Sequence, residues 1–346
     1  MRILVTGGSG FIGSYFVELL CGQGHEVTVL DLEPPPSWFP RHAFIRGDIR
    51  DARTMRRALT GRDRIVHLAA AHHDFGIARE TYFSVNDHGS KVVADAMDET
   101  GVRELVFYST VAVYGDAPEP HHEDSAMAPN SPYGESKLAG ERVFEAWTGK
   151  GEGRRCLVIR PTVTFGPRNF ANMYSLIRQV HSGRYLEFGP GRNIKSLSYV
   201  ENIVEATMFL WARDAGERGA FEVYNFIDKP DLTSRQITEA VFRSLGKRPP
   251  RGALPMWVGL LLAFPFDIVI ALTGKNLPIS SARLKKLYEV QTKFEADRLA
   301  SAGFRPKIPL TEGIDRMVRW YLREGKDQRA VWRLPPREPV IATGEA

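Results

Sequence analysis

Cysteine is scarce in this sequence, because its 346 residues contain only Cys21 and Cys156. Two cysteines in separate segments provide neither a disulfide framework nor a cysteine-based metal site. Both lie among apolar neighbours, so we expect core thiols in a reducing compartment. A strong charge of one sign is also lacking, since 46 lysines and arginines against 41 acidic residues leave +5. This balance gives no indication of nucleic-acid binding.

A charged leader with a cleavage site is absent as well, and MRILVTGG at the start reads directly as a strand and a turn. We therefore expect a cytoplasmic protein. Long hydrophobic runs are limited to ALPMWVGLLLAFPFDIVIAL at 253–272, which contains Pro255, Pro265 and Asp267. We expect two short buried helices broken at Pro265.

The alternative for 253–272 is a pair of helices at a membrane surface, which would give peripheral membrane contact and admit a lipid-like substrate. Basic residues on both sides favour this alternative, because they would meet anionic headgroups. These residues are Lys247, Arg248, Arg251 and Lys275.

Apolar runs that predict strands alternate with periodic runs that predict helices through the first half of the chain. This alternation predicts a parallel sheet covered on both faces, and hence a doubly wound α/β (Rossmann) fold. After about residue 167 the runs become mainly helical. We expect a cofactor domain with the catalytic residues at 1–167 and a smaller, mainly helical substrate region at 168–325, parts of which return to the main sheet. Residues 326–346 are expected to form an extended or disordered tail.

A glycine-rich turn, TGGSGFIG at 6–13, follows the first expected strand and opens a helix. Gly7, Gly10 and Gly13 allow backbone amides to approach a pyrophosphate at the start of that helix. The second strand ends in Asp31, whose carboxylate can accept ribose hydroxyls and repel a 2′-phosphate. The pattern predicts a dinucleotide site that favours NAD over NADP. The nearby basic residues that would instead favour NADP are Arg41 and Arg46.

Tyr133 and Lys137, in SPYGESK, lie four positions apart at the start of an expected helix and therefore share one face. A lysine charge beside a phenol lowers the pKa of the tyrosine from about 10 toward neutrality, where it can act as a base. Asp48 and Ile49, in RGDIRD, follow the third expected strand, where they can hold an adenine ring. The alternative for these two residues is a simple turn and helix cap.

These motifs, taken in order over about residues 1–215, resemble the extended short-chain dehydrogenase/reductase family of the epimerase/dehydratase type. The matching pieces are TGGSGFIG, Asp31, GDIRD, HLAA (67–70), VNDHGS (85–90), VFYSTVAVYGD (106–116), SPYGESK and RPTVTFGPR (160–168). The resemblance implies that Tyr133 removes a hydroxyl proton as hydride leaves for NAD, while Lys137 contacts the nicotinamide ribose. It also implies that Thr110 orients the substrate oxygen, with Ser109 as a neighbouring candidate.

The resemblance extends to further site residues. The cofactor contacts it implies are Gly7, Gly10, Phe11, Ile12, Gly13, Asp31, Asp48, Ile49, Leu68, Ala69, Ala70 and Lys137. The substrate candidates are Ser109, His72, Val163, Arg168 and Lys195. Val163 stands where nucleotide-sugar epimerases often have an asparagine, and Lys195 where they commonly have an arginine. His72 follows the fourth strand, where a substrate or loop contact is expected and not a metal.

Dehydratases of this type carry Asp-Glu after the serine or threonine, whereas this chain has Val111 and Ala112. The prediction is therefore an NAD-dependent oxidoreductase or epimerase that acts on a secondary alcohol of a nucleotide-linked sugar, as a homodimer. One alternative is a 3β-hydroxysteroid or isoprenoid-type dehydrogenase at the membrane surface, because the hydrophobic insertion resembles the sterol-dehydrogenase branch. The other is a non-catalytic NAD-binding redox sensor or scaffold, which would not need Tyr133 as a proton acceptor.

Overall fold

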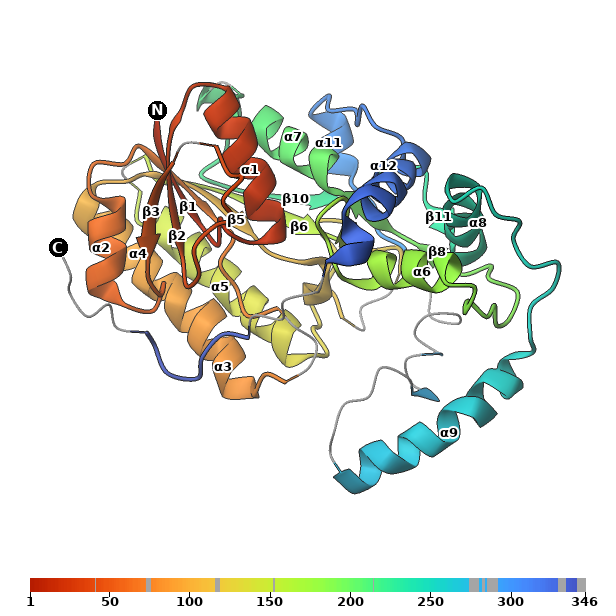
Figure 1. Ribbon diagram of the computed structural model, residues 1–346. Coiled ribbons are helices and arrows are strands. Elements are labelled where there is room, and N and C mark those ends of the chain that lie inside the picture. The colour runs from red at the N-terminus through yellow and green to blue at the C-terminus, as the bar shows by residue number, and fades with distance from the viewer. Residues whose placement is uncertain are drawn as a thin grey trace.

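A seven-stranded parallel sheet forms the centre of the molecule (Figure 1). The computed structural model describes residues 1–40, 42–72, 76–115, 119–151, 153–213, 215–273, 280–281, 284, 292–328 and 334–340. The strands in spatial order are β10 (Phe221–Phe226), β6 (Arg155–Pro161), β5 (Glu104–Tyr108), β4 (Arg64–His67), β1 (Arg2–Thr6), β2 (Glu26–Asp31) and β3 (Ala43–Arg46). Strand order reverses between β1 and β4, so the predicted doubly wound fold is confirmed.

Helices cover both faces of this sheet, as the continuous apolar strands require. One face packs against α2 (Ala52–Leu59), α4 (Gly89–Thr100) and α5 (Pro132–Gly149) through a buried apolar cluster. The other face packs against α1 (Phe11–Gly22) and α7 (Val200–Trp211) through a second cluster. A short α3 (Arg79–Phe83) and the π-helix η1 (Ser84–His88) lead into α4. Cys156 is buried in β6, and Cys21 is half-buried in α1.

A smaller region beyond β6 has its own apolar cluster, formed mainly by α6 (Asn172–His181), α8 (Ser234–Ser244) and α12 (Leu310–Arg323). It contains two small sheets, in which β7 (Val163–Phe165) pairs with β9 (Leu197–Tyr199) and β8 (Ile194–Lys195) pairs with β11 (Leu232–Thr233). The chain returns to the main sheet at β10, and α11 (Asp297–Ser301) packs against that strand. The described segments also include the short turns η2 (Val111–Val113), η3 (Ala215–Glu217) and η4 (Gly325–Asp327).

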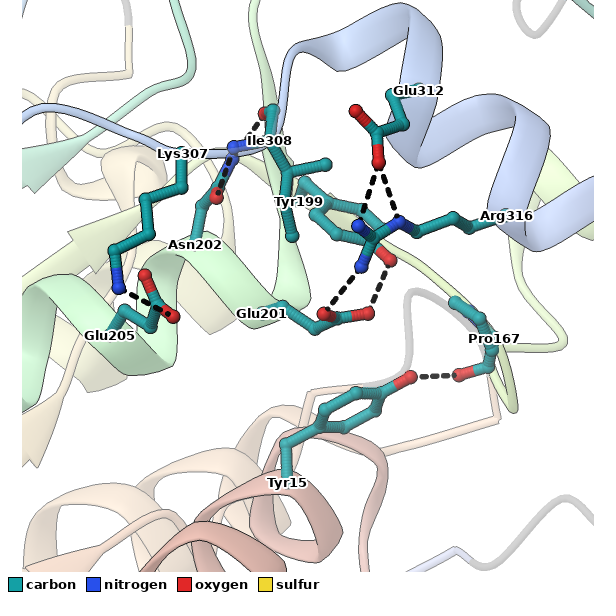
Figure 2. Close-up of polar contacts among 10 residues, drawn as sticks. All are labelled: Tyr15, Pro167, Tyr199, Glu201, Asn202, Glu205, Lys307, Ile308, Glu312 and Arg316. Carbon is teal, nitrogen blue, oxygen red and sulfur yellow. Dashed lines mark hydrogen bonds and ion pairs between the residues drawn. The ribbon is translucent and has the colours of Figure 1, made fainter.

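Polar contacts join α12 to α7 and so fix the smaller region on the sheet (Figure 2). The guanidinium of Arg316 donates to Glu201 at 2.9 Å and to Glu312 at 2.7 Å. The buried amide of Asn202 donates to the carbonyl of Ile308 at 2.7 Å and to Asp228 at the same distance. Asn202 therefore links α7 to the segments that contain Asp228 and Ile308.

The hydrophobic run forms one helix, α9 (Met256–Thr273), which projects from the body of the molecule (Figure 1). The prediction of two short buried helices broken at Pro265 is wrong. Only Gly259 and Ala263 of α9 are buried, and the hydrophobic clusters of the described residues include no α9 side chain. The helix runs through Pro265 as a single element, in which the proline leaves out one backbone hydrogen bond because it has no N–H.

Candidate active site

The glycine-rich turn joins β1 to α1 at the carboxyl edge of the sheet. Gly7 has φ +70°, and a Cβ there would lie 2.7 Å from the backbone nitrogen of Ala69, on the loop after β4. A Cβ at Gly13 would lie 2.4 Å from the carbonyl oxygen of Gly7. At Gly10, the N-cap of α1, the nearest protein atom to such a Cβ is the same carbonyl, at 3.1 Å. The start of α1, with Phe11 and Ile12 in its first turn, therefore presents free backbone amides that suit a pyrophosphate.

Asp31 lies at the end of β2, directly beside this turn. Its carboxylate accepts the backbone N–H of Ser9 at 3.1 Å and that of Glu33 at 3.3 Å. Arg46, one of the two basic residues that would favour NADP, lies 3.6 Å from Glu33 and donates to the carbonyl of Leu32. The other, Arg41, lies outside the described residues. A carboxylate held at this place suits two ribose hydroxyls and opposes a 2′-phosphate.

The loop after β4 lies on the other side of the turn and contains Leu68, Ala69 and Ala70. The backbone N–H of Leu68 donates to the carbonyl of Thr6 at 3.0 Å, which places this loop at the point where strand order reverses. His72 is exposed, with Nδ1 3.3 Å from the carbonyl oxygen of Ala70. In the described part of the chain no group of histidine, cysteine and acidic side chains is arranged to hold a metal.

Asp48 is enclosed by its neighbour Arg50 and by the C-terminal segment 334–340. The two side chains form a buried ion pair at 2.7 Å, with 4% and 0% of their surfaces exposed. The backbone N–H of Val340 donates to Asp48 at 3.1 Å, and Arg50 donates to the carbonyls of residues 336–338. Ile49 is buried against α4 and would contact a Cβ at Gly89. Sequence reasoning missed Arg50, although its place two residues after Asp48 was a usable signal.

The catalytic candidates lie on α5. Ser131 caps this helix by accepting the N–H of Gly134 at 3.2 Å, which places Tyr133 in the first turn and Lys137 in the next. Lys137 is 2% exposed, and its ammonium lies 4.1 Å from the ring centroid of Phe107. Burial lowers the pKa of Lys137 to about 7, while Glu141 acts in the opposite direction. A lysine held in this way responds strongly to any negative charge that forms nearby.

Thr110 lies at the end of β5 and starts the turn η2, where its hydroxyl accepts the N–H of Ala112 at 3.1 Å. A Cβ at Gly134 would lie 2.5 Å from the carbonyl oxygen of Ala112. Because Gly134 has no Cβ, the first turn of α5 can pack directly against η2. Thr110, which starts η2, and Tyr133, in the first turn of α5, therefore lie on two elements in direct contact.

Ser109 is directed elsewhere, because its hydroxyl donates to the buried carboxylate of Glu141. Glu141 also forms a buried ion pair with Arg160 at 2.6 Å, and Arg160 donates to the hydroxyl of Tyr114 at 2.9 Å. This network joins α5 to β6 from beneath. Ser109 therefore belongs to this buried network, whereas the hydroxyl of Thr110 bonds to the turn η2.

The remaining substrate candidates lie beyond β6, in the part of the chain that follows the main catalytic motifs. Val163 is exposed on β7, and Lys195 is half-buried on β8. Arg168 pairs with Glu18 of α1 at 2.8 Å and lies 4.1 Å from the ring centroid of Tyr15. It lines a cleft of about 920 Å³ that runs along α1 from Gly10 and does not include the α5 candidates.

Replacing Lys137 by methionine should stabilise the protein, measured without added NAD, at neutral and lower pH. The pKa falls from 10.5 in the unfolded chain to about 7 in the folded one, so between these values the unfolded chain binds more protons and stability rises with pH. Below pH 7 the buried charge destabilises the wild type in full. Urea unfolding of both proteins should therefore show a gap that is largest at about pH 6 and nearly closed at about pH 10. A gap that is constant with pH would contradict the buried charge.

A doubly wound sheet, a glycine turn with a following carboxylate, and a tyrosine–lysine helix at the same edge define a dinucleotide-dependent oxidoreductase. The model of the NAD dependent epimerase/dehydratase family matches residues 3–225. The chain belongs to this family, whose cofactor is NAD, as the sequence predicted.

Similar proteins cover nearly the whole chain. The N-acetyl-alpha-D-glucosaminyl-diphospho-ditrans,octacis-undecaprenol 4-epimerase of Escherichia coli O157:H7 is 37% identical over 92% of this chain and 95% of its own length. The UDP-glucose 4-epimerase of Thermus thermophilus, solved with NAD, is 26% identical, with a TM-score of 0.70 over 94% of this chain and all of that one. DesIV, a dTDP-glucose 4,6-dehydratase from Streptomyces venezuelae solved with NAD and DAU as a double mutant, is 27% identical, with a TM-score of 0.73 over 94% and 98%.

Proposed function

We propose that the protein is an NAD-dependent 4-epimerase of a sugar carried on a diphosphate. The observation that carries the proposal is the packing of Thr110, Tyr133 and the buried Lys137 at the sheet edge that also holds the glycine turn. Both epimerases described above are named as 4-epimerases of a sugar attached to a diphosphate. We further propose that 1–167 holds the cofactor and the catalytic residues and that 168–325 holds the substrate.

Bound NAD would take a hydride from C4 of the sugar and return it to the opposite face of the same carbon. Tyr133, as the phenolate, accepts the hydroxyl proton in the first step and returns it to the oxygen in the second, so protons and electrons balance over the cycle. Lys137 stabilises the phenolate by its charge, and Thr110 holds the reacting oxygen through its hydroxyl. Gly7, Gly13 and the first amides of α1 would hold the pyrophosphate, and Asp31 the adenosine ribose.

Epimerisation is favoured over dehydration because of the residues in η2. Elimination of water needs an acid and a base beside the oxidised carbon, which dehydratases of this type place directly after the serine or threonine. Val111 and Ala112 occupy those two positions here and carry no ionisable group. Without such a pair, elimination of water from the oxidised sugar is not expected.

Assay in deuterium oxide with NAD tests this function. The substrates are UDP-glucose, UDP-N-acetylglucosamine and N-acetylglucosamine on a polyprenyl diphosphate, with the products identified by NMR. We expect inversion at C4 of at least one substrate, no deuterium at C4 because the hydride returns directly, and no accumulation of NADH. A keto-deoxy product or stoichiometric NADH would contradict epimerisation, and the absence of turnover would favour a sensor or scaffold.

A further inference from the structure

The helix α9 is apolar on all sides and exposed. Eight of its large apolar side chains have exposed fractions between 37% and 82%. They are Trp257, Leu261, Leu262, Phe264, Phe266, Ile268, Val269 and Leu272. Leu261, Leu262 and Phe264 point in three different directions, because successive residues of a helix are about 100° apart. A groove on another protein would cover one side of such a helix, whereas lipid can surround most of it.

One charged residue, Asp267, interrupts the apolar surface of α9. Its carboxylate is half-buried and accepts the backbone N–H of Ser281 at 3.0 Å, so the charge is directed toward the chain that follows the helix. The 18 residues of α9 have the length and composition of a membrane span, at about 27 Å. Asp267 lies in the second half of α9 and is hydrogen-bonded to Ser281. Its charge therefore favours a helix that lies in the membrane interface over one that crosses the bilayer.

The segment that leads into α9, residues 246–255, is positively charged. Residues 246–255 read GKRPPRGALP, with three cations and no acidic residue. Lys247 donates to the carbonyls of Val180 and His181 at the end of α6, and Arg248 and Arg251 are exposed. Cations beside an apolar helix suit the anionic headgroups of a bilayer, since each contributes about 1 kcal/mol near such a surface.

The segment before α9 and the segment after it are both bound to the same part of the substrate region. Before the helix, Leu254 donates to the carbonyl of Glu187 at 2.8 Å and accepts from Gly189 at 2.9 Å. After it, Thr292 donates to the carbonyl of Ile194 at 3.0 Å and accepts from Ser196 at 3.1 Å. Both ends are thus hydrogen-bonded to residues 187–196, the stretch that contains Lys195. A membrane under α9 would adjoin the region proposed to hold the substrate.

From these observations we propose that α9 lies in the surface of an anionic bilayer and that the diphosphate of the substrate is linked to a long polyprenyl chain held in that bilayer. This proposal rests on the proposed 4-epimerase function, and names the carrier that its site accepts. The helix positions the substrate region at the headgroup level, where the diphosphate of such a lipid lies. A nucleotide carrier would dissolve in water and would give α9 no role.

Sedimentation with phosphatidylcholine vesicles, with and without phosphatidylglycerol, tests the membrane contact. We expect the wild type to bind the anionic vesicles, and Leu261→Asp and Leu272→Asp each to weaken binding by about tenfold or more, since a leucine buried in lipid contributes about 1.5–3 kcal/mol. The control is Leu322→Asp, which changes a partly exposed leucine of α12, 36% exposed, and should bind as the wild type does. Failure of the wild type to bind vesicles would overturn the proposal. A wild-type dimer that binds no vesicles and that Leu272→Asp dissociates would also overturn it, because α9 would then be a contact between two copies.

Turnover with the same variants tests the carrier. Leu272→Asp should slow epimerisation of polyprenyl diphosphate-linked N-acetylglucosamine in vesicles by about tenfold and leave turnover of the same sugar on a soluble, short-chain prenyl diphosphate unchanged. Turnover of UDP-sugars alone, in a protein that binds vesicles, would overturn the lipid carrier and keep the epimerase. Vesicle binding without turnover of any sugar would instead refute the proposed function.

Discussion

Replacing Tyr133 by phenylalanine should reduce kcat by about 10²–10⁴-fold and leave NAD affinity nearly unchanged. The tyrosine ring is half-buried against the cluster beneath α4 and α5, and lies 6.3 Å from the ring of Tyr82. Phenylalanine keeps these apolar contacts and removes only the group that exchanges the proton. Initial rates with saturating substrate and fluorescence titration with NAD would measure the two quantities separately.

The matched control for this variant is Tyr174→Phe in α6. The hydroxyl of Tyr174 donates to the carbonyl of Gly325 at 3.0 Å, and the residue lies in the core of the smaller region. Its loss should lower stability slightly and change kcat by less than about threefold. If Tyr133→Phe kept more than about a tenth of the wild-type rate, the general base would have to be another group.

Replacing Gly134 by alanine should lower kcat by about 100-fold, although the added methyl group carries no chemistry. The new Cβ would lie 2.5 Å from the carbonyl oxygen of Ala112, a backbone atom that cannot rotate away. The first turn of α5 and the turn η2 must therefore separate, which moves Tyr133 away from Thr110. A displacement of about 1 Å at reacting groups costs about 10²-fold in rate.

Gly149→Ala, at the other end of the same helix, is the control for Gly134→Ala. No atom lies within 4 Å of a Cβ at Gly149, so this change should preserve kcat and, if anything, raise thermal stability. The two variants would be compared by initial rates and by thermal unfolding. Unaltered turnover in folded Gly134→Ala would show that the α5–η2 spacing does not set the rate.

Local signals were enough to predict the sheet and the cofactor turn. The strands are continuous apolar runs whose burial on both faces follows from their composition alone, and the turn at Gly7 and Gly13 depends on contacts within one β–α–β neighbourhood. Tyr133 and Lys137 could be paired because helix geometry relates positions four apart. Each of these inferences uses residues that are close in sequence or in adjacent parallel strands.

Other features depend on contacts that no short pattern contains. Ser109 and Thr110 are neighbours at the end of a strand, so their side chains point to opposite faces, and only the position of Glu141 shows which face is the interior. The exposure of α9 depends on how the other elements pack, because the hydrophobic clusters of the described residues form without its side chains. The enclosure of Asp48 needs Val340, which is 292 positions away.

The segment 334–340 has a practical consequence for labelling and fusion. A group attached directly after Val340 would lie close to Asp48, because the backbone N–H of Val340 donates to that carboxylate at 3.1 Å. The amino terminus lies at the opposite edge of the sheet, because β1 runs from Arg2 toward the glycine turn. An affinity tag therefore belongs before Met1, and a fluorophore placed after Val340 would report events at the β3–α2 turn.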